Sequence, residues 1–398
     1  MKISGIICEY NPFHNGHEYL IREAKKTADV VVAVMSGNFV QRGDVAIVDK
    51  YVRAKSAILG GADLVLELPF PFCSASAAYF AEAGVRILSM AGADTLVFGS
   101  ECGDISRLST LADYSLSEDF IREKKNVAVG EGSASAHFQA FCQNGETLHL
   151  LPNDILAVEY LRAIKKAKFS METRAILRMG DGFSEEMLGE SAYSSATALR
   201  KALREERLCL LDRYMPKDSH EALCLAVERG EAPASLELAA RAVLGFFRLT
   251  LPNTLTNIAG LGNGLEYRLC DCAGKSTSIE DFFSMVSTKR YTDATIRRAV
   301  LAAMLGVVWD DLDRGVAYST LLGANQKGRT LLSALRKKNL PIVTKPSDIN
   351  GLCARFPKNE REIRRQAELS WRADALYTLC LPRVEETGKY LRGEAVIF

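Results

Sequence analysis

Short apolar runs alternate with helix-like stretches through the first half of the chain. Runs rich in aliphatic and β-branched residues predict five strands, at Ile3–Cys8, Val30–Met35, Asp63–Leu68, Thr95–Phe98 and Thr173–Leu177. The stretches between them predict helices, at Gly16–Lys26, Lys50–Leu59 and Ala75–Met90. Because continuous apolar strands that alternate with helices are typical of a sheet covered on both faces, we expect a doubly wound α/β domain around a parallel sheet.

After about residue 205 the strand signals fade and helical periodicity dominates. The clearest helix patterns lie at Ser235–Phe247, Ser278–Met285, Thr292–Leu305 and Glu360–Tyr377. A chain of 398 residues suits two or three domains, at roughly 100–200 residues each. We therefore expect an α/β domain over residues 1–205 and a mainly α-helical domain over residues 206–398.

Two of the five histidines, His14 and His17, follow the first predicted strand in an H-x-G-H pattern that opens a helix. A helix N-terminus offers free backbone N–H groups, and Gly16 lets the backbone approach a phosphate closely. Two imidazoles one turn apart can face the same ligand. We interpret them as catalytic residues that stabilise charge developing on an α-phosphate during nucleotidyl transfer.

The same two histidines could instead form half of a metal site or a simple capped helix start. A zinc site needs three or four ligands, and no other histidine or close cysteine pair is near in sequence. We therefore expect no metal ligand among the protein side chains.

Three motifs carry a family resemblance. They are the run Gly5-Ile6-Ile7-Cys8-Glu9-Tyr10-Asn11-Pro12-Phe13-His14-Asn15-Gly16-His17, the run Met35-Ser36-Gly37-Asn38-Phe39-Val40-Gln41-Arg42-Gly43, and the run Leu96-Val97-Phe98-Gly99-Ser100-Glu101. The first resembles the HIGH-type nucleotidylyltransferase superfamily, which has a Rossmann-like fold. Together they resemble the bacterial tRNA(Met) cytidine acetate ligase family.

The resemblance implies that ATP and acetate give acetyl-adenylate and pyrophosphate, and that the acetyl group passes to N4 of the wobble cytidine in elongator tRNA(Met). Mg²⁺ is expected with the phosphates. Besides the catalytic His14 and His17, the implied ATP-binding residues are Ile7, Cys8, Glu9, Tyr10, Asn11, Pro12, Phe13, Asn15, Gly16, Gly99, Asn153, Arg178, Ser195, Thr197 and Arg200.

Several of these residues have a plainer alternative. The run Ser195-Ala196-Thr197-Ala198-Leu199-Arg200 resembles the S-S-T-x-x-R signature of the superfamily, except that Ala196 removes one hydroxyl. An ordinary capped helix over Ser194–Leu203 would explain it as well. Gly99 could be a turn glycine, Asn153 an N-cap, and Arg178 a surface charge. Arg42 could bind an anion or be a solvated loop residue.

Basic residues gather in the second half, although the net charge of the whole chain is only +1. The segment Lys327–Arg372, which includes Lys337 and Lys338, has twelve Lys or Arg against four Asp or Glu. A second cluster surrounds Tyr291 and consists of Lys289, Arg290, Arg297 and Arg298. Such clusters attract a phosphate backbone and an aromatic ring can stack on an unpaired base, so we expect tRNA contact there, in the anticodon region. Solvated helix faces are the alternative.

The remaining composition excludes several classes of protein. The ten cysteines are scattered and form no C-x-x-C pair, which indicates neither a disulfide framework nor a zinc ribbon. No apolar run approaches the ~18–20 residues of a membrane helix, and the N-terminus is charged too early for a signal peptide, so we expect a cytoplasmic protein. Two rival functions stay open: a nucleotidylyltransferase that joins AMP to a phosphorylated metabolite, and a non-catalytic RNA-binding protein with a relict ATP fold.

Overall fold

The computed structural model describes residues 1–120, 150–179, 188, 191–288 and 291–398. Its centre is a sheet in the order β10-β8-β5-β2-β1-β6-β7, with β9 beside β8. The strands are β1 (Ile3–Cys8), β2 (Val30–Ser36), β5 (Leu64–Leu68), β6 (Thr95–Ser100), β7 (Glu172–Leu177), β8 (Ser319–Ala324), β9 (Ile342–Val343) and β10 (Val396–Ile397). A separate antiparallel hairpin pairs β3 (Phe39–Val40) with β4 (Asp44–Val45).

The five predicted strands are all present and pair in parallel. From β1 the chain adds β2 and β5 on one side, then crosses to β6 and β7 on the other. This reversal at β1 is the switch point of a doubly wound sheet, and a ligand crevice is expected beyond the carboxyl ends of the strands there. The predicted fold class is therefore confirmed.

The second half is mainly helical, as predicted, but it also adds three strands that the sequence did not indicate. These are β8, antiparallel to β5, and β9 and β10, parallel to β8. All six residues of β8 are buried, in the sequence Ser-Thr-Leu-Leu-Gly-Ala. A short apolar run of this kind has no period that separates a strand from a buried helical turn.

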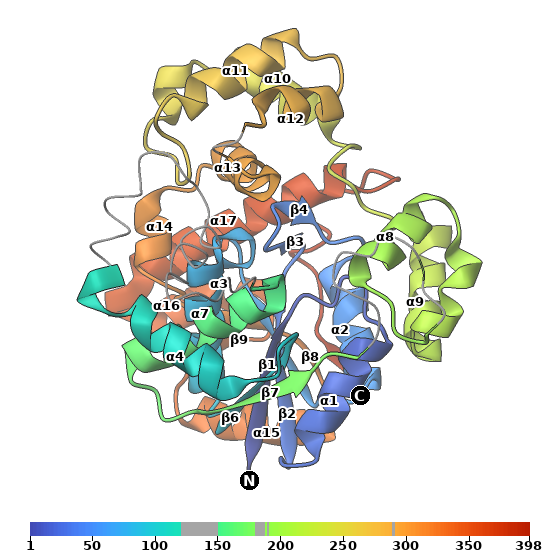
Figure 1. Ribbon diagram of the computed structural model, residues 1–398, viewed down its shortest axis with the longest axis vertical. Coiled ribbons are helices and arrows are strands. Elements are labelled where there is room, and N and C mark those ends of the chain that lie inside the picture. Colours follow the sequence, from blue (N-terminus) through green and yellow to red (C-terminus); the bar gives the residue numbers. More distant parts are fainter. Residues whose placement is uncertain (121–149, 180–187, 189–190, 289–290) are drawn as a thin grey trace, which may run out of the picture.

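Helices cover both faces of the sheet (Figure 1). The helices of the first half are α1 (Asn15–Lys25), α2 (Lys50–Leu59), α3 (Ala77–Met90), α4 (Ile105–Ser115), α7 (Pro152–Ala167) and α8 (Ala196–Arg204). Those of the second half are α9 (Lys217–Glu228), α10 (Ala240–Leu249), α11 (Leu265–Lys275), α12 (Ile279–Val286), α13 (Asp293–Leu305), α14 (Trp309–Asp313), α15 (Gln326–Lys337), α16 (Ile349–Arg355) and α17 (Glu360–Leu379). Short 3-10 turns lie at Phe72–Ser74, Leu208–Leu210, Asp212–Tyr214, Pro252–Leu255, Pro346–Asp348 and Pro357–Asn359.

Neighbouring residues of each strand point to opposite faces, which divides the core into two layers. Ile6, Val31 and Val65 pack in one cluster with residues of α1 and α2. Ile7, Val32 and other strand residues join the larger cluster with α3, α7 and helices of the second half, including α17. The core is therefore continuous from the sheet into the second half, while α10, α11 and α12 lie at one end of the molecule (Figure 1). Within the described residues no helix is long and apolar enough to cross a membrane.

Candidate functional site

The turn between β1 and α1 places both histidines of the H-x-G-H pattern at a helix start. His14 is the N-cap of α1, and its Nδ1 accepts a hydrogen bond from the backbone N–H of Gly16 at 3.1 Å. The Nδ1 of His17 accepts in turn from the backbone N–H of His14 at 3.3 Å. This is a capping box built from two imidazoles. Because each Nδ1 accepts, the neutral rings carry their proton on Nε2, which is left to donate.

Both rings are held neutral by their surroundings. Burial lowers the pKa of His14 to about 3, and the charges of Arg178 and Arg200 act in the same direction. Burial, His14 and Arg178 lower the pKa of His17 well below its usual value. The two rings stack with centroids 3.6 Å apart. The pair therefore presents two neutral N–H donors in a fixed arrangement, rather than two cations.

A cavity of about 350 Å³ opens at this helix start, beyond the carboxyl ends of the strands. The residues that line it come from segments spread along the first 200 residues, from Ile7 to Arg200. The predicted site residues that line it are Ile7, Cys8, Glu9, His14, Gly16, His17, Gly99, Asn153, Arg178, Ser195, Thr197 and Arg200.

Five other predicted residues lie in the turn behind the cavity lining: Tyr10, Asn11, Pro12, Phe13 and Asn15. Tyr10 and Phe13 are buried and pack against His17, with ring centroids 4.9 and 5.8 Å from it. The side-chain oxygen of Asn11 accepts from the backbone of Ile47, and Asn15 donates to the carbonyls of Ala192 and Arg213. These contacts shape the histidine turn.

The start of α8 also lines the cavity. Ser195 is the N-cap, and its hydroxyl accepts from the backbone N–H of Ala198 at 3.0 Å. Arg200 donates to the carbonyl of Asn11 at 2.8 Å and to the hydroxyl of Thr197 at 3.1 Å. The capped helix and the cavity lining are therefore both observed, since the residues that stabilise the helix also face the hollow.

Gly99, Asn153 and Arg178 come together where β6 and β7 end. Asn153 is the second residue of α7, whose N-cap is Leu151, so the alternative that Asn153 is an N-cap is wrong. Its side chain donates to Glu101 instead. The backbone N–H of Arg178 bonds the carbonyl of Ser100 at 3.0 Å. Burial lowers the pKa of Arg178, against the opposing charge of Glu101.

Arg42, which the sequence analysis named as a possible anion ligand, lines the cavity. Sequence reasoning did not place the other lining residues, which are Tyr19, Leu20, Gln41, Ala77, Phe80, Phe98, Pro152, Ile155, Leu156, Tyr160, Ile176, Leu177, Met179, Tyr193, Ser194 and Ala196. Most are apolar residues that match the hydrophobic pattern of α3, α7 or a strand, so nothing in the pattern separates them from core. Only Gln41 and Arg42 carried a signal, because they follow β3 within a family motif.

The basic residues predicted to contact tRNA occupy different surroundings. Lys289 and Arg290 lie outside the described residues. Arg298 donates to the carbonyl of Gln41 at 3.1 Å, and Arg297 lies over the ring of Phe283 at 4.3 Å, so both have partners within the protein. Lys337 and Lys338 are exposed at the end of α15.

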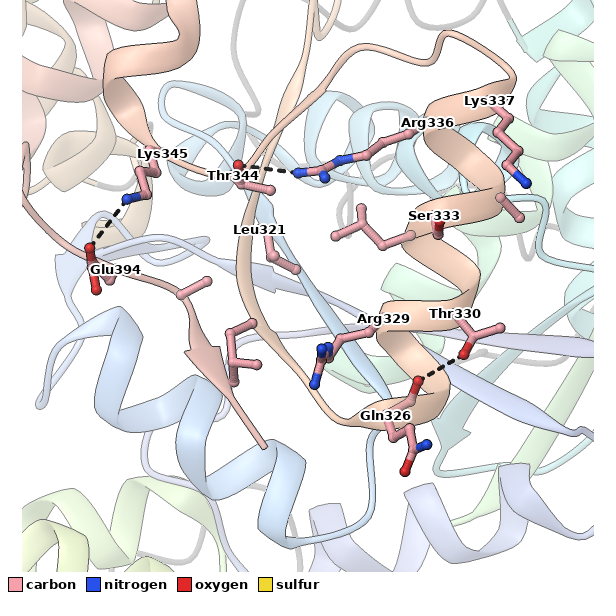
Figure 2. A pocket seen from close by; sticks show the side chains of 14 residues that line it. Leu321, Gln326, Arg329, Thr330, Ser333, Arg336, Lys337, Thr344, Lys345 and Glu394 are labelled. Atoms are coloured by element: carbon pink, nitrogen blue, oxygen red, sulfur yellow. Dashed lines mark hydrogen bonds and ion pairs between the residues drawn. The ribbon is translucent and has the colours of Figure 1, made fainter.

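A second, wider hollow of about 1030 Å³ runs between α15 and β10. Figure 2 shows Arg329 pointing from α15 into it, Arg336 bonded to Thr344, and Lys345 paired with Glu394 at 3.3 Å. Lys337 also lines it. The charged lining is thus mostly basic.

A family model described as HIGH Nucleotidyl Transferase matches residues 1–390. The tRNA(Met) cytidine acetate ligase of Acetivibrio thermocellus is 36% identical and covers 100% of both chains. That of Thermosipho africanus is 37% identical over 90% of this chain and 88% of its own. The chain belongs to the tRNA(Met) cytidine acetate ligase family.

Solved structures agree with this membership. The crystal structure of Thermotoga maritima TmcAL bound with alpha-thio ATP is 33% identical, with a TM-score of 0.91 over 100% of this chain and 99% of that one. The apo form I of the same protein gives a TM-score of 0.92 over 100% of both chains. The cytidine acetate ligase fold therefore extends over the whole chain, including the second half where the sequence resemblance is weaker.

Proposed function

We propose that this protein is an ATP-dependent ligase that activates acetate as acetyl-adenylate and transfers the acetyl group to N4 of the wobble cytidine of elongator tRNA(Met). The names of the full-length relatives support this activity. The observation that carries it is the pair of neutral Nε2–H donors of His14 and His17 at the N-terminus of α1, in the ligand cavity. Fixed donors at a helix N-terminus match a phosphate that gains charge.

In the first step an acetate oxygen attacks the α-phosphorus of ATP, the bond to the bridging oxygen of the β-phosphate breaks, and pyrophosphate leaves. His14 and His17 donate to the oxygens that gain charge. Arg200, fixed by Asn11 and Thr197, and Arg178 add positive charge around them. No side-chain nucleophile is required, because acetate is the nucleophile and its orientation accounts for most of the rate.

In the second step the N4 amine attacks the acetyl carbonyl, AMP leaves, and the amine loses a proton. Mg²⁺ would neutralise charge on the phosphates when bound with ATP. Among the described residues there is no group of three or more His, Cys, Asp or Glu side chains that could hold a metal ion. Phosphate oxygens and water would therefore supply most of its ligands.

We assign nucleotide chemistry to residues 1–205 and RNA binding to residues 206–398, with the anticodon region at the cavity. The basic hollow beside α15 supports this assignment, because Arg329, Arg336 and Lys337 line it. A tRNA substrate agrees with a cytoplasmic location. The proposed RNA-binding residues remain Lys289, Arg290, Arg297, Arg298, Lys337 and Lys338.

The test is pyrophosphate release from ATP by the full chain with Mg²⁺ and acetate, with and without bulk bacterial tRNA. Mass spectrometry of the digested tRNA reads the product. Acetate-dependent pyrophosphate together with acetylated cytidine is expected. Pyrophosphate that depends on a phosphorylated metabolite would favour the nucleotidylyltransferase, and tRNA binding without pyrophosphate would favour the non-catalytic protein.

A matched pair of variants links the activity to the histidines. His14→Asn keeps a side chain that can cap α1 but loses the imidazole donor, and we expect pyrophosphate release to fall while tRNA affinity stays. His220→Asn is the control, since His220 lies on α9 and bonds only the carbonyl of Leu208 and the thiol of Cys224 among the contacts of the described chain. Equal loss in both variants would contradict the assignment.

A further inference from the structure

One wall of the cavity comes from the tip of the β3–β4 hairpin, Gln41–Gly43. Gln41 and Arg42 of this tip line the cavity. The side chain of Gln41 also reaches the carbonyl of Ala75 at 3.5 Å. The tip therefore lies beside the start of α3, whose Ala77 and Phe80 line the same cavity. The cavity lining thus includes Arg42 together with the apolar side chains of Ala77 and Phe80.

The tip is held from two sides. The backbone N–H of Gln41 donates to a carboxylate oxygen of Glu9, at the end of β1, at 2.8 Å. On the other side Arg298 of α13 donates to the carbonyl of Gln41 at 3.1 Å and to the hydroxyl of Thr295 at 3.2 Å. Both contacts join the tip to elements outside its own hairpin, so its position in the cavity is fixed before any ligand arrives.

Gly43 shows how closely the tip packs on α13. Its φ is +74°, a conformation that favours glycine. A Cβ at this position would lie 2.5 Å from the backbone nitrogen of Arg298. Figure 1 shows the hairpin beneath α13. Helix α13, whose arginines the sequence predicts to contact RNA, therefore supports the hairpin tip that lines the cavity.

Among the described residues three arginines line the cavity, and two of them belong to the proposed nucleotide site. Arg178 and Arg200 act on the pKa of His14, and Arg200 is bonded to Asn11 and Thr197. Arg42 comes from the hairpin tip, next to Gln41, which contacts Glu9 and Ala75, and its charge helps to lower the pKa of Arg200. Guanidinium groups bind carboxylates as a planar fork, and the acid that attacks the α-phosphate needs such a partner.

We propose that the hairpin tip forms the subsite for the carboxylic acid. In this subsite Arg42 holds the carboxylate of acetate, and the methyl group of acetate faces Ala77 and Phe80. Arg298 is a positioning residue that keeps the tip in place from α13. This inference rests on the proposed function and names the acid site within it. One carboxylate oxygen forms the bond to the α-phosphorus as the bond to pyrophosphate breaks, so Arg42 holds the acid without entering the bond changes.

The test is ATP–pyrophosphate exchange driven by acetate, with and without tRNA. For Arg42→Gln we expect the KM for acetate to rise roughly 10- to 100-fold, as expected for a lost charge-assisted contact, while the KM for ATP stays within about twofold. Arg298→Lys keeps the charge but loses the fork. We expect it to raise the KM for acetate less than Arg42→Gln does, with the KM for ATP again unchanged and a wild-type melting temperature.

Arg107→Gln, at an exposed position of α4 outside the cavity lining, is the control and should leave both constants unchanged. A parallel rise in the KM for ATP would make Arg42 a nucleotide ligand and overturn the proposal. Unchanged KM values with weaker tRNA binding would make it an RNA contact and overturn it too. If the wild type shows no acetate-dependent exchange, the proposed function fails and this inference with it.

Discussion

The ammonium nitrogen of Lys50, in α2, lies 2.8 Å from a carboxylate oxygen of Asp374, in α17, although 324 residues separate them. The same nitrogen lies 2.9 Å from Glu67 in β5, and the side chain of Asn38 donates to Asp374 at 2.9 Å. All four residues are buried. This network joins the last long helix to the nucleotide-binding sheet.

Lys50→Met should destabilise the protein strongly, by about 3–5 kcal/mol, because it leaves Glu67 and Asp374 buried without their cation. Asp374→Asn should cost less, since Lys50 keeps Glu67 and the amide can still bond Asn38. Urea unfolding of both variants measures the difference. Similar losses in the two variants would mean that the ammonium group is not what holds the network together.

Acid should destabilise the fold through His14. Its pKa is about 3 in the folded protein and about 6.5 when unfolded, so the unfolded chain binds a proton that the folded one does not between these values. Stability therefore falls as the pH falls below about 6.5, and from pH 7 to pH 5 this single residue contributes a loss of about 2 kcal/mol.

Urea unfolding at pH 7, 6 and 5 tests this, with His14→Asn for comparison. The asparagine variant should lose about 2 kcal/mol less than the wild type over the same range, because its side chain does not titrate. Parallel pH profiles for the two proteins would show that the imidazole is not protected from protonation in the fold.

Gly43→Ala should displace the hairpin tip from α13, because its Cβ would collide with the backbone of Arg298. We expect weaker use of acetate and a smaller effect on ATP, measured by the same exchange reaction. Gly245→Ala, in α10, is a suitable control, because a Cβ at that position would meet no atom within 4 Å. An unchanged KM for acetate would show that the tip tolerates displacement.

Charge reversal at the end of α15 should weaken RNA binding without affecting adenylation. Lys337→Glu with Lys338→Glu should raise the Kd for tRNA by roughly 10-fold at moderate salt and lessen its salt dependence, because phosphate contacts release counterions. Filter binding at several salt concentrations measures both. Lys217→Glu with Lys275→Glu, at exposed positions of α9 and α11, is the matched double reversal, and equal effects would indicate attraction to net charge alone.

Thr197→Val should weaken ATP binding through Arg200, which would lose its hydroxyl partner while keeping the carbonyl of Asn11. We expect a several-fold rise in the KM for ATP, about 1 kcal/mol for one lost hydrogen bond, and no change in the KM for acetate. Steady-state kinetics with each substrate varied separately would show it. A change confined to the KM for acetate would place Thr197 at the acetate end of the cavity and contradict this prediction.

The local sequence pattern was sufficient to predict much of the proposed nucleotide site. The first strand, the histidine pair and the start of α1 lie in one short run of residues, so period and motif together predicted their arrangement. The same pattern could not distinguish the lining residues His14 and Gly16 from Tyr10 and Phe13, which are buried behind them. Which side chains face a cavity depends on how the turn packs, and a linear motif does not encode that direction.

By itself the sequence determined the parallel strands, the helices between them and the position of His14 and His17 at the helix start after β1, because these follow from the spacing of residues near one another. Only the tertiary structure decided that β8 completes the sheet, that Lys50 pairs with Asp374, and that Arg298 supports the tip at Gln41. These contacts join segments hundreds of residues apart. The stability of these contacts depends on the burial of both partners and on the distance between them in the fold. The hydrophobic periodicity of a local segment contains no information on either.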